Sequence, residues 1–227
     1  MKSNKLLVRN ILLIGSAVTL SMFAVSAYAW WQLPSDVQLP IHWNAVGEVD
    51  RYAGKAEGLL LLPAISIGIF ALLILILKIE PRKLNLSQST KAFTAMVACV
   101  GGILFLTQAV VVAVAFGLEV NAVAVITAAT GALMIVIGNF MGKIRSNFMF
   151  GVRTPWTLSS ELSWNKTNRL AGKLLMALGL FMLILAFTAT TGPILIYGVG
   201  GLLVAITAFS FVYSYLVWRG DTEAQRA

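Results

Sequence analysis

The stretch Gly138–Lys173, GNFMGKIRSNFMFGVRTPWTLSSELSWNKTNRLAGK, decides the fold, because it is the longest polar-containing segment between strongly apolar runs. It holds six of the 17 lysine and arginine residues of the chain but a single acidic residue, Glu161. Pro155 interrupts it, and the tryptophans Trp156 and Trp164 follow. We therefore expect a loop on one side of a membrane, held there by hydrophobic helices.

The composition excludes an ordinary soluble domain. Of the 227 residues 59% are hydrophobic and 11% are charged, whereas soluble domains carry about 25% charged residues. The net charge of +8 comes from basic residues beside apolar runs. This placement favours contact with anionic lipid headgroups and control of topology over direct nucleic-acid binding. A single cysteine, Cys99, leaves no intramolecular disulfide to form.

Six apolar runs reach the ~20 residues that a membrane-spanning helix needs. Their approximate bounds are Val8–Ala29, Leu59–Leu77, Phe93–Leu118, Val120–Phe140, Leu170–Ala189 and Pro193–Trp218. Apart from Arg9 and Lys173, near the starts of the first and fifth runs, these runs carry no acidic or basic residue. We predict an all-α, polytopic membrane protein with about six transmembrane helices in three hairpins and a small extracytoplasmic subdomain after the first helix.

Charge patterning sets the expected orientation. With a cytoplasmic N-terminus, 15 of the 17 lysine and arginine residues would lie inside, and only Arg51 and Lys55 outside. The positive-inside rule favours this arrangement, with both termini in the cytoplasm. The outer connections 117–119 and 190–192 are short enough to make antiparallel hairpins.

Small residues should line the helix contacts, because lipid removes the hydrophobic drive for helices to associate. Ala124, Ala128 and Ala132 recur every four residues on the fourth run, and Gly138 and Gly142 prolong the stripe. We expect this stripe to mark ordinary helix packing.

The outer loop, residues 30–58, has the pattern of a small subdomain. A short extended run, Val37–Trp43, precedes Asn44–Gly47, which suits a turn because Asn and Gly tolerate positive φ. Three tryptophans of this region fit the aromatic belt at a membrane surface: Trp30, Trp31 and Trp43. Five acidic residues against two basic ones leave the outer side at −3, which would attract a cationic peptide.

Three interpretations of the outer loop stay open. It could face a ligand through His42, Trp43, Asn44, Gly47, Asp50 and Arg51. It could hold a divalent metal through His42, Glu48, Asp50 and Glu57, although zinc sites usually show two or more His or Cys residues at short spacing. We therefore expect the loop to bind neither a metal nor a cofactor. Alternatively, His42 and Asn44 hydrogen-bond the loop while Asp50 and Arg51 pair locally or with Lys55.

The inner loop should break at Thr154, because Pro155 disfavours helix there. Hydroxyl residues and then Glu161 favour a helix from about Leu158, with Glu161, Asn165 and either Asn168 or Arg169 on one face. The loop is either a basic, tryptophan-anchored headgroup-binding segment or a site with defined contacts. The candidate residues of that site are Asn139, Lys143, Asn147, Arg153, Thr154, Pro155, Trp156, Trp164 and Arg169.

Four motifs carry a resemblance to a known family. G-N-x-M-x-K-I-x-x-N at 138–147, G-V-R-T-P-W-T-L at 151–158 and W-x-x-T-x-R-x-x-G at 164–172 together resemble the signature of the SdpI family of bacterial membrane immunity proteins. L-P-I-H-W-N-x-x-G-x-x-D at 39–50 resembles a domain of unknown function found in the same proteins. Two residues depart from the pattern: Asn168 stands where many members have His, and Gly142 where Pro is common.

The resemblance implies an N-terminal hairpin at 1–80, containing the loop 30–58, and a four-helix core at 91–218, containing the loop 138–173. It also implies a protein of the bacterial inner membrane that protects its cell from a secreted, membrane-active peptide toxin of the SDP type. A cytoplasmic ArsR-type repressor, held at the membrane when toxin is present, is an implied partner, beside the membrane lipids.

A transporter and an intramembrane enzyme are the two alternatives to an immunity protein. A small-molecule or peptide transporter that is coupled to ions would place ionisable residues inside the membrane. Here the span interiors offer groups such as Thr107, Gln108 and Thr127, which provide no carboxylate for a proton relay. An intramembrane metallopeptidase with an HExxH motif needs two histidines, and the chain has one, His42. A serine nucleophile would have only His42 as its base, and a carboxylate mechanism through Glu48, Asp50 or Glu57 stays open. Of these classes we expect immunity and no enzyme.

Overall fold

The computed structural model describes residues 2–44, 46–188 and 192–224. Within them, six helices are long and apolar enough to cross a membrane. They are α1 (Lys2–Gln32), α2 (Lys55–Ile79), α4 (Thr90–Ala115), α5 (Ala122–Met141), α7 (Glu161–Phe187) and the π-helical turn η1 (Ile194–Val199) continued by α8 (Gly200–Arg219). The predicted six-span, mainly helical fold is confirmed.

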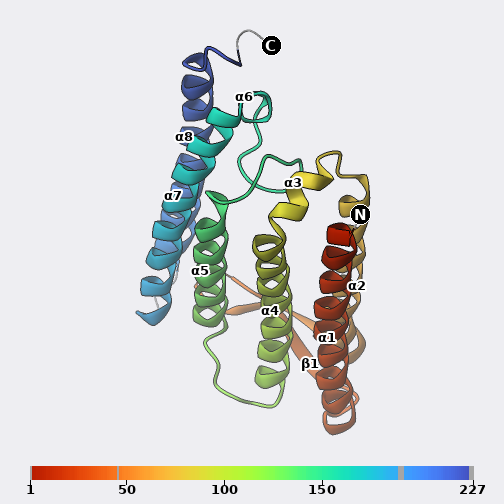
Figure 1. The fold of residues 1–227 in the computed structure, drawn as a ribbon. Coiled ribbons are helices and arrows are strands. Elements are labelled where there is room, and N and C mark those ends of the chain that lie inside the picture. Colours follow the sequence, from red (N-terminus) through yellow and green to blue (C-terminus); the bar gives the residue numbers. More distant parts are fainter. Residues whose placement is uncertain (1, 45, 189–191, 225–227) are drawn as a thin grey trace.

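The connections gather at the two ends of the bundle. Figure 1 shows the start of α1 and the end of α8 on the same side as the short helices α3 (Lys83–Gln88) and α6 (Pro155–Ser159), and we call this the terminal end. The turn between α4 and α5 lies at the other end, which we call the hairpin end. The predicted inner helix and the fifth span form one continuous helix, α7. Thr190 and Thr191 of the predicted turn 190–192 lie outside the described residues.

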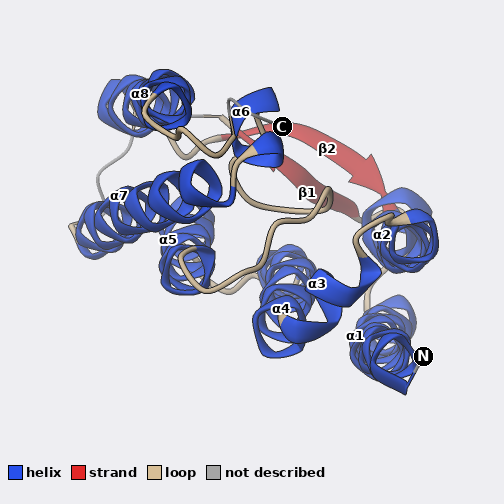
Figure 2. Cartoon of the chain, turned by 45° about the horizontal axis from the view of Figure 1, so that its top comes forward, coloured by secondary structure: helices blue, strands red, loops and turns tan. Residues whose placement is uncertain are grey.

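The helices pack as two neighbouring groups that α4 and α5 join (Figure 2). At the terminal end of the first group, α1, α2, α3 and α4 share a core built around Leu7, Phe70 and Phe93. In the second group, α7 lies between α5 and α8. The predicted division of the chain into 1–80 and 91–218 stays a prediction.

A proline inside α2 creates a polar node in the first group. Pro63 has no N–H, so the carbonyl of Leu59, one turn earlier, has no donor within the helix. Ser26 Oγ of α1 donates to this carbonyl at 2.7 Å. Gln108 Nε2 of α4 donates to Ser26 Oγ at 2.9 Å and approaches the same carbonyl at 3.3 Å. The node therefore ties α1, α2 and α4 together in apolar surroundings.

Replacing Ser26 with alanine is expected to lower the free energy of unfolding by about 1 kcal/mol, since the Leu59 carbonyl loses its shortest donor. In a Pro63→Ala background the loss should shrink, because the restored N–H of residue 63 can donate to the same carbonyl. Thermal unfolding in detergent of the two single variants and the double variant measures this coupling. Equal losses in both backgrounds would contradict the node.

Glycine pairs bring α5 and α7 into backbone contact. A Cβ added at Gly179 would lie 2.5 Å from the carbonyl oxygen of Gly131, and one added at Gly172 would lie 2.5 Å from that of Gly138. Within each helix the two glycines are seven residues, or about two turns, apart. The predicted stripe differs from this face, because Ala132 is exposed. Gly138 is the stripe residue that makes the closest contact.

A two-stranded antiparallel sheet follows α1. Strand β1 (Gln38–Trp43) pairs with β2 (Val49–Gly54), with Leu39 opposite Ala53. Leu39 is fully buried in a cluster with residues of α1, α2 and α4, so the hairpin is seated on the bundle. Figure 1 shows it behind α4 and α5. The predicted extended run is confirmed as β1, and β2 is an element that the sequence pattern did not indicate.

Candidate functional site

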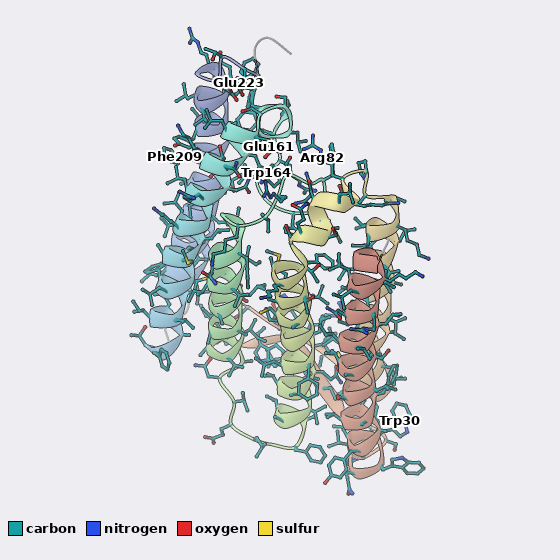
Figure 3. The ribbon with its side chains drawn as sticks, in the orientation of Figure 1. Trp30, Arg82, Glu161, Trp164, Phe209 and Glu223 are labelled. Carbon is teal, nitrogen blue, oxygen red and sulfur yellow. The ribbon has the colours of Figure 1, made fainter. Side chains whose placement is uncertain are left out.

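The candidate residues fall into two groups, one at each end of the molecule. The outer-loop candidates lie on the β hairpin, and the inner-loop candidates lie between α5 and the first turns of α7. Figure 3 shows Arg82 and Trp164 near each other at the terminal end and Trp30 at the hairpin end.

Asn44 fixes the tip of the hairpin. Its side-chain oxygen accepts from the backbone N–H groups of Val46 and Glu48, both at 3.0 Å, and its amide donates to the Glu48 carboxylate at 3.2 Å. Gly47 has a φ of +90°, which a glycine adopts without strain. Ala45, in the middle of the predicted turn, lies outside the described residues. Asn44 and Gly47 therefore shape the turn through local contacts.

Two exposed side-chain contacts involve the hairpin. The strand register shifts between His42 and Trp43, and Asp50 Oδ1 lies 2.6 Å from His42 Nδ1. Arg51 pairs with Glu57 of α2 at 2.8 Å. Among the described residues, no group of three His, Cys, Asp or Glu side chains lies close enough to hold a metal ion. The contacts of His42 and Asn44 agree with the local hydrogen-bonding interpretation. Its expected pairing with Lys55 differs from the structure, because Asp50 contacts His42, Arg51 contacts Glu57, and Lys55 donates to the carbonyl of Leu33.

A cleft of about 330 Å³ opens between the hairpin and the helices α4 and α5. The hairpin contributes residues 41–44, which include the candidates His42, Trp43 and Asn44. The helices contribute mainly apolar side chains together with Thr107 and Thr127. Apolar walls with a few polar groups are typical of a binding site. Gly47, Asp50 and Arg51 do not line it.

At the terminal end, Asn147 and Trp164 are fully buried and hold the loop in shape. Asn147 accepts from the N–H groups of Met149 at 2.8 Å and Phe150 at 2.9 Å, and its amide donates to the carbonyl of Arg145 at 2.8 Å. The indole N–H of Trp164 donates to the carbonyl of Ile144 at 2.8 Å. The structure thus gives these two candidates defined contacts inside the protein.

Thr154 and Pro155 start α6. Thr154 and Thr157 exchange side-chain to backbone hydrogen bonds as a capping box, and Pro155 occupies the first helical position, where no N–H is needed. Thr154 Oγ1 also lies 2.9 Å from Ser214 Oγ of α8. Trp156 packs edge-on against Phe211 of α8, with ring centroids 4.9 Å apart. The expected chain break is therefore a short helix docked on α8.

Asn168, where the family resemblance leads one to expect histidine, closes the loop onto α7. Its side-chain oxygen accepts from the N–H of Val152 at 2.8 Å, and its amide donates to the carbonyl of Trp164 at 3.0 Å. It is fully buried, so Arg169, not Asn168, shares the exposed face with Glu161 and Asn165. A neutral amide serves this structural role without a titrating group.

Glu80 and Arg82, just after α2, are site residues that the sequence reasoning missed. The Glu80 carboxylate is 2% exposed. It accepts from the N–H groups of Arg82 at 3.0 Å and Phe148 at 3.2 Å. Arg82 donates to the Ser146 hydroxyl and, at 2.8 Å, to the carbonyl of Leu158. A lone acid next to Pro81 in an otherwise basic connection was the signal that could have revealed this pair.

The C-terminal segment also contacts this region. Ser160 caps α7 by accepting from the N–H of Ser163 at 2.9 Å. Its hydroxyl donates to Asp221 Oδ2 at 2.5 Å, and this bond lowers the pKa of the Asp221 carboxyl below its ordinary value. The loop is therefore held from both sides, by the end of α2 and by the end of α8.

The remaining inner candidates are exposed. Asn139 accepts from Lys143 Nζ at 3.2 Å, and Arg153 donates to the carbonyl of Phe148. Arg169 lies on the exposed face of α7. Among the described residues, the contacts between a basic group and a carboxylate are His42–Asp50 and Arg51–Glu57. Lys143, Arg153 and Arg169 therefore have no carboxylate partner among the described residues. They give the terminal end a basic surface.

Comparison with known proteins finds two family matches and one similar curated protein. Residues 143–214 match the SdpI/YfhL protein family, and residues 17–67 match a domain of unknown function, DUF1648. A protein named immunity protein SdpI, from Bacillus subtilis (strain 168), is 28% identical over 193 residues, which cover 85% of this chain and 89% of that protein. No solved structure matches significantly.

Both family matches fall on the segments that carry the candidate residues. The first match includes the buried residues Asn147 and Trp164 and the whole of α7. The second includes the β hairpin, the second half of α1 and the first half of α2. With six apolar helices and a relative aligned along most of both chains, the protein is a multi-pass membrane protein that is similar to the SdpI family.

Proposed function

We propose that this chain is an immunity protein that protects its own cell from a secreted, membrane-active peptide toxin of the SDP type. It would lie in the bacterial inner membrane with both termini in the cytoplasm, as the distribution of lysine and arginine favours. The observation that carries the proposal is the alignment with an immunity protein along 85% of the chain.

The toxin would meet the cleft between the hairpin and α4 and α5. The walls of this cleft are mostly apolar, so they suit an amphipathic peptide that partitions into the membrane surface. Exposed carboxylates of Glu48, Asp50 and Glu57 lie on the same hairpin region and favour a cationic peptide. Trp43 and Asn44, at the cleft edge, would contact the peptide directly.

A survival assay tests the protection. The chain is expressed in a Bacillus strain that lacks its own immunity protein, and the cells are exposed to purified SDP-type peptide. We expect survival above that of cells with an empty vector. Wild-type protein present in the membrane fraction at normal amounts, without any protection, would contradict the proposed function.

A cleft-filling variant tests where the peptide binds. Val123 lines the cleft from α5, and Val123→Phe should raise the protein level needed for protection about tenfold, which corresponds to about 1.4 kcal/mol of lost binding. Ala132→Phe is the matched control, because Ala132 is exposed on the same helix and does not line the cleft. Equal protection by both variants, at equal membrane amounts, would remove the cleft from the proposal.

A receptor role is a second part of the proposal. The exposed cations of the terminal end would contact a cytoplasmic ArsR-type repressor and hold it at the membrane when toxin is bound. Such coupling requires two conformations that toxin binds unequally. Recovery of the repressor in the membrane fraction, with and without toxin, tests it. Arg169→Glu should abolish that recovery, whereas Lys5→Glu, on α1, should not.

Transport is the alternative function. Ion-coupled carriers usually place ionisable residues in the middle of the membrane. Among the described spans, the acidic residues are Glu57 and Glu161, in the first turns of α2 and α7. This position supports immunity over carboxylate-coupled transport. Peptide flux into proteoliposomes that contain the purified chain would favour transport over immunity.

A further inference from the structure

A groove of about 480 Å³ lies between α5, α7 and α8, at the terminal end of the bundle and away from the hairpin. Its walls are mainly apolar. They include Ile137 and Met141 of α5, Leu175 of α7, and Leu203, Ile206 and Phe211 of α8. Residues 151–154 of the inner loop also line it. Because the three helices are membrane spans, the walls of this groove face hydrocarbon.

Two polar side chains of the lining, Arg153 and Ser210, lack partners that their chemistry would accept. Arg153 is exposed, and the described residues offer its guanidinium no carboxylate within ion-pair distance. Ser210 is 3% exposed, and its hydroxyl has no hydrogen-bond partner among the described residues. Arg153, which donates to the carbonyl of Phe148 but has no carboxylate partner among the described residues, therefore lines the same mainly apolar groove as the unpartnered hydroxyl of Ser210.

One class of molecule fits all of these features. We propose that the groove binds an anionic phospholipid from the leaflet on the terminal side. Its phosphate is paired with Arg153, its ester region is hydrogen-bonded to Ser210, and an acyl chain lies against the apolar walls. Basic pockets between transmembrane helices bind anionic headgroups in this way. A free phosphate would leave the apolar walls uncovered.

The aromatic residues beside the groove suit the same ligand. Trp156 packs edge-on against Phe211 and Tyr215, with ring centroids 4.9 and 5.2 Å apart. Tryptophan and tyrosine prefer the headgroup level of a bilayer. The ring cluster therefore places Arg153, three residues before Trp156, at the depth of the lipid phosphates.

Native mass spectrometry of the purified full chain tests the site. The protein is released from detergent after incubation with equal amounts of phosphatidylglycerol and phosphatidylcholine. We expect one phosphatidylglycerol to be retained in preference to phosphatidylcholine. Arg153→Gln should reduce this preference about tenfold, because it removes a charge-assisted pair. Arg145→Gln is the matched control, since Arg145 is exposed in the same loop but does not line the groove.

A second pair of variants tests the acyl chain. Thr207 is exposed and lines the groove from α8, so Thr207→Trp should lower retention of both lipids. Val204→Trp, exposed on the same helix but outside the lining, should leave retention unchanged. Thermal unfolding checks that each variant is folded.

Four outcomes would overturn the proposal: equal retention of the two lipids by the wild type, equal effects of Arg153→Gln and Arg145→Gln, no effect of Thr207→Trp, or binding of inorganic phosphate in place of lipid. None of these measurements involves toxin, so they stand apart from the survival assay.

Discussion

Gly138→Ala is expected to lower the free energy of unfolding by about 1–3 kcal/mol, as overpacking of a close contact does. The added Cβ would overlap the carbonyl oxygen of Gly172 and lie 2.8 Å from Met176 Cγ. The oxygen belongs to a helix backbone and cannot rotate away, so α5 and α7 must move apart along their shared face. Thermal unfolding of the purified protein in detergent measures the loss.

Gly102→Ala is the control for this substitution. Gly102 lies inside α4, and a Cβ there would meet no atom within 4 Å. Alanine is the better helix former, so we expect unchanged or slightly higher stability. Gly179→Ala, at the other end of the same interface, should resemble Gly138→Ala. Similar losses in Gly102→Ala and Gly138→Ala would mean that backbone contact between α5 and α7 is not the cause.

Asn147→Ala should cost about 2–4 kcal/mol, because two N–H groups of the loop lose their acceptor and a carbonyl loses its donor. The loop 143–153 would then lose its fixed shape. We expect faster cleavage of this loop by protease in inside-out vesicles, together with a lower unfolding temperature and loss of protection against toxin.

Asn139→Ala is the matched control for Asn147→Ala. Both residues are asparagines of the predicted site, but Asn139 is exposed and, among the described residues, its side chain bonds only Lys143. We expect a change within about 0.5 kcal/mol, as for most surface substitutions. A large effect at Asn139 with none at Asn147 would show that the loop is not organised around Asn147.

The sequence predicted the spans well because hydrocarbon imposes a strict requirement. A span must be about 20 residues long and apolar, and the chain carries six such runs. The second strand, β2, gave no comparable signal. Its sequence, VDRYAG, carries two charges in six residues and becomes a strand because β1 supplies the hydrogen bonds.

The candidate site was predicted by residue type and not by role. A loop asparagine gives the same signal whether it is buried, like Asn147, or exposed, like Asn139, because burial depends on segments far away in the chain. Glu80 shows the same limit, since its partner Phe148 lies 68 residues later. The 78–91 connection has a basic net charge, which hid the role of Glu80 as a buried acceptor within it.

The length of α7 has a mechanical consequence. Its 27 residues extend for about 40 Å, which exceeds the ~30 Å of the hydrocarbon layer. The first turns, which carry Trp164 and Asn168, therefore extend beyond the lipid tails. They belong to the same continuous helix that reaches the opposite face of the membrane. A tilt imposed at the far end of this rod would reach the inner loop without passing through a flexible joint.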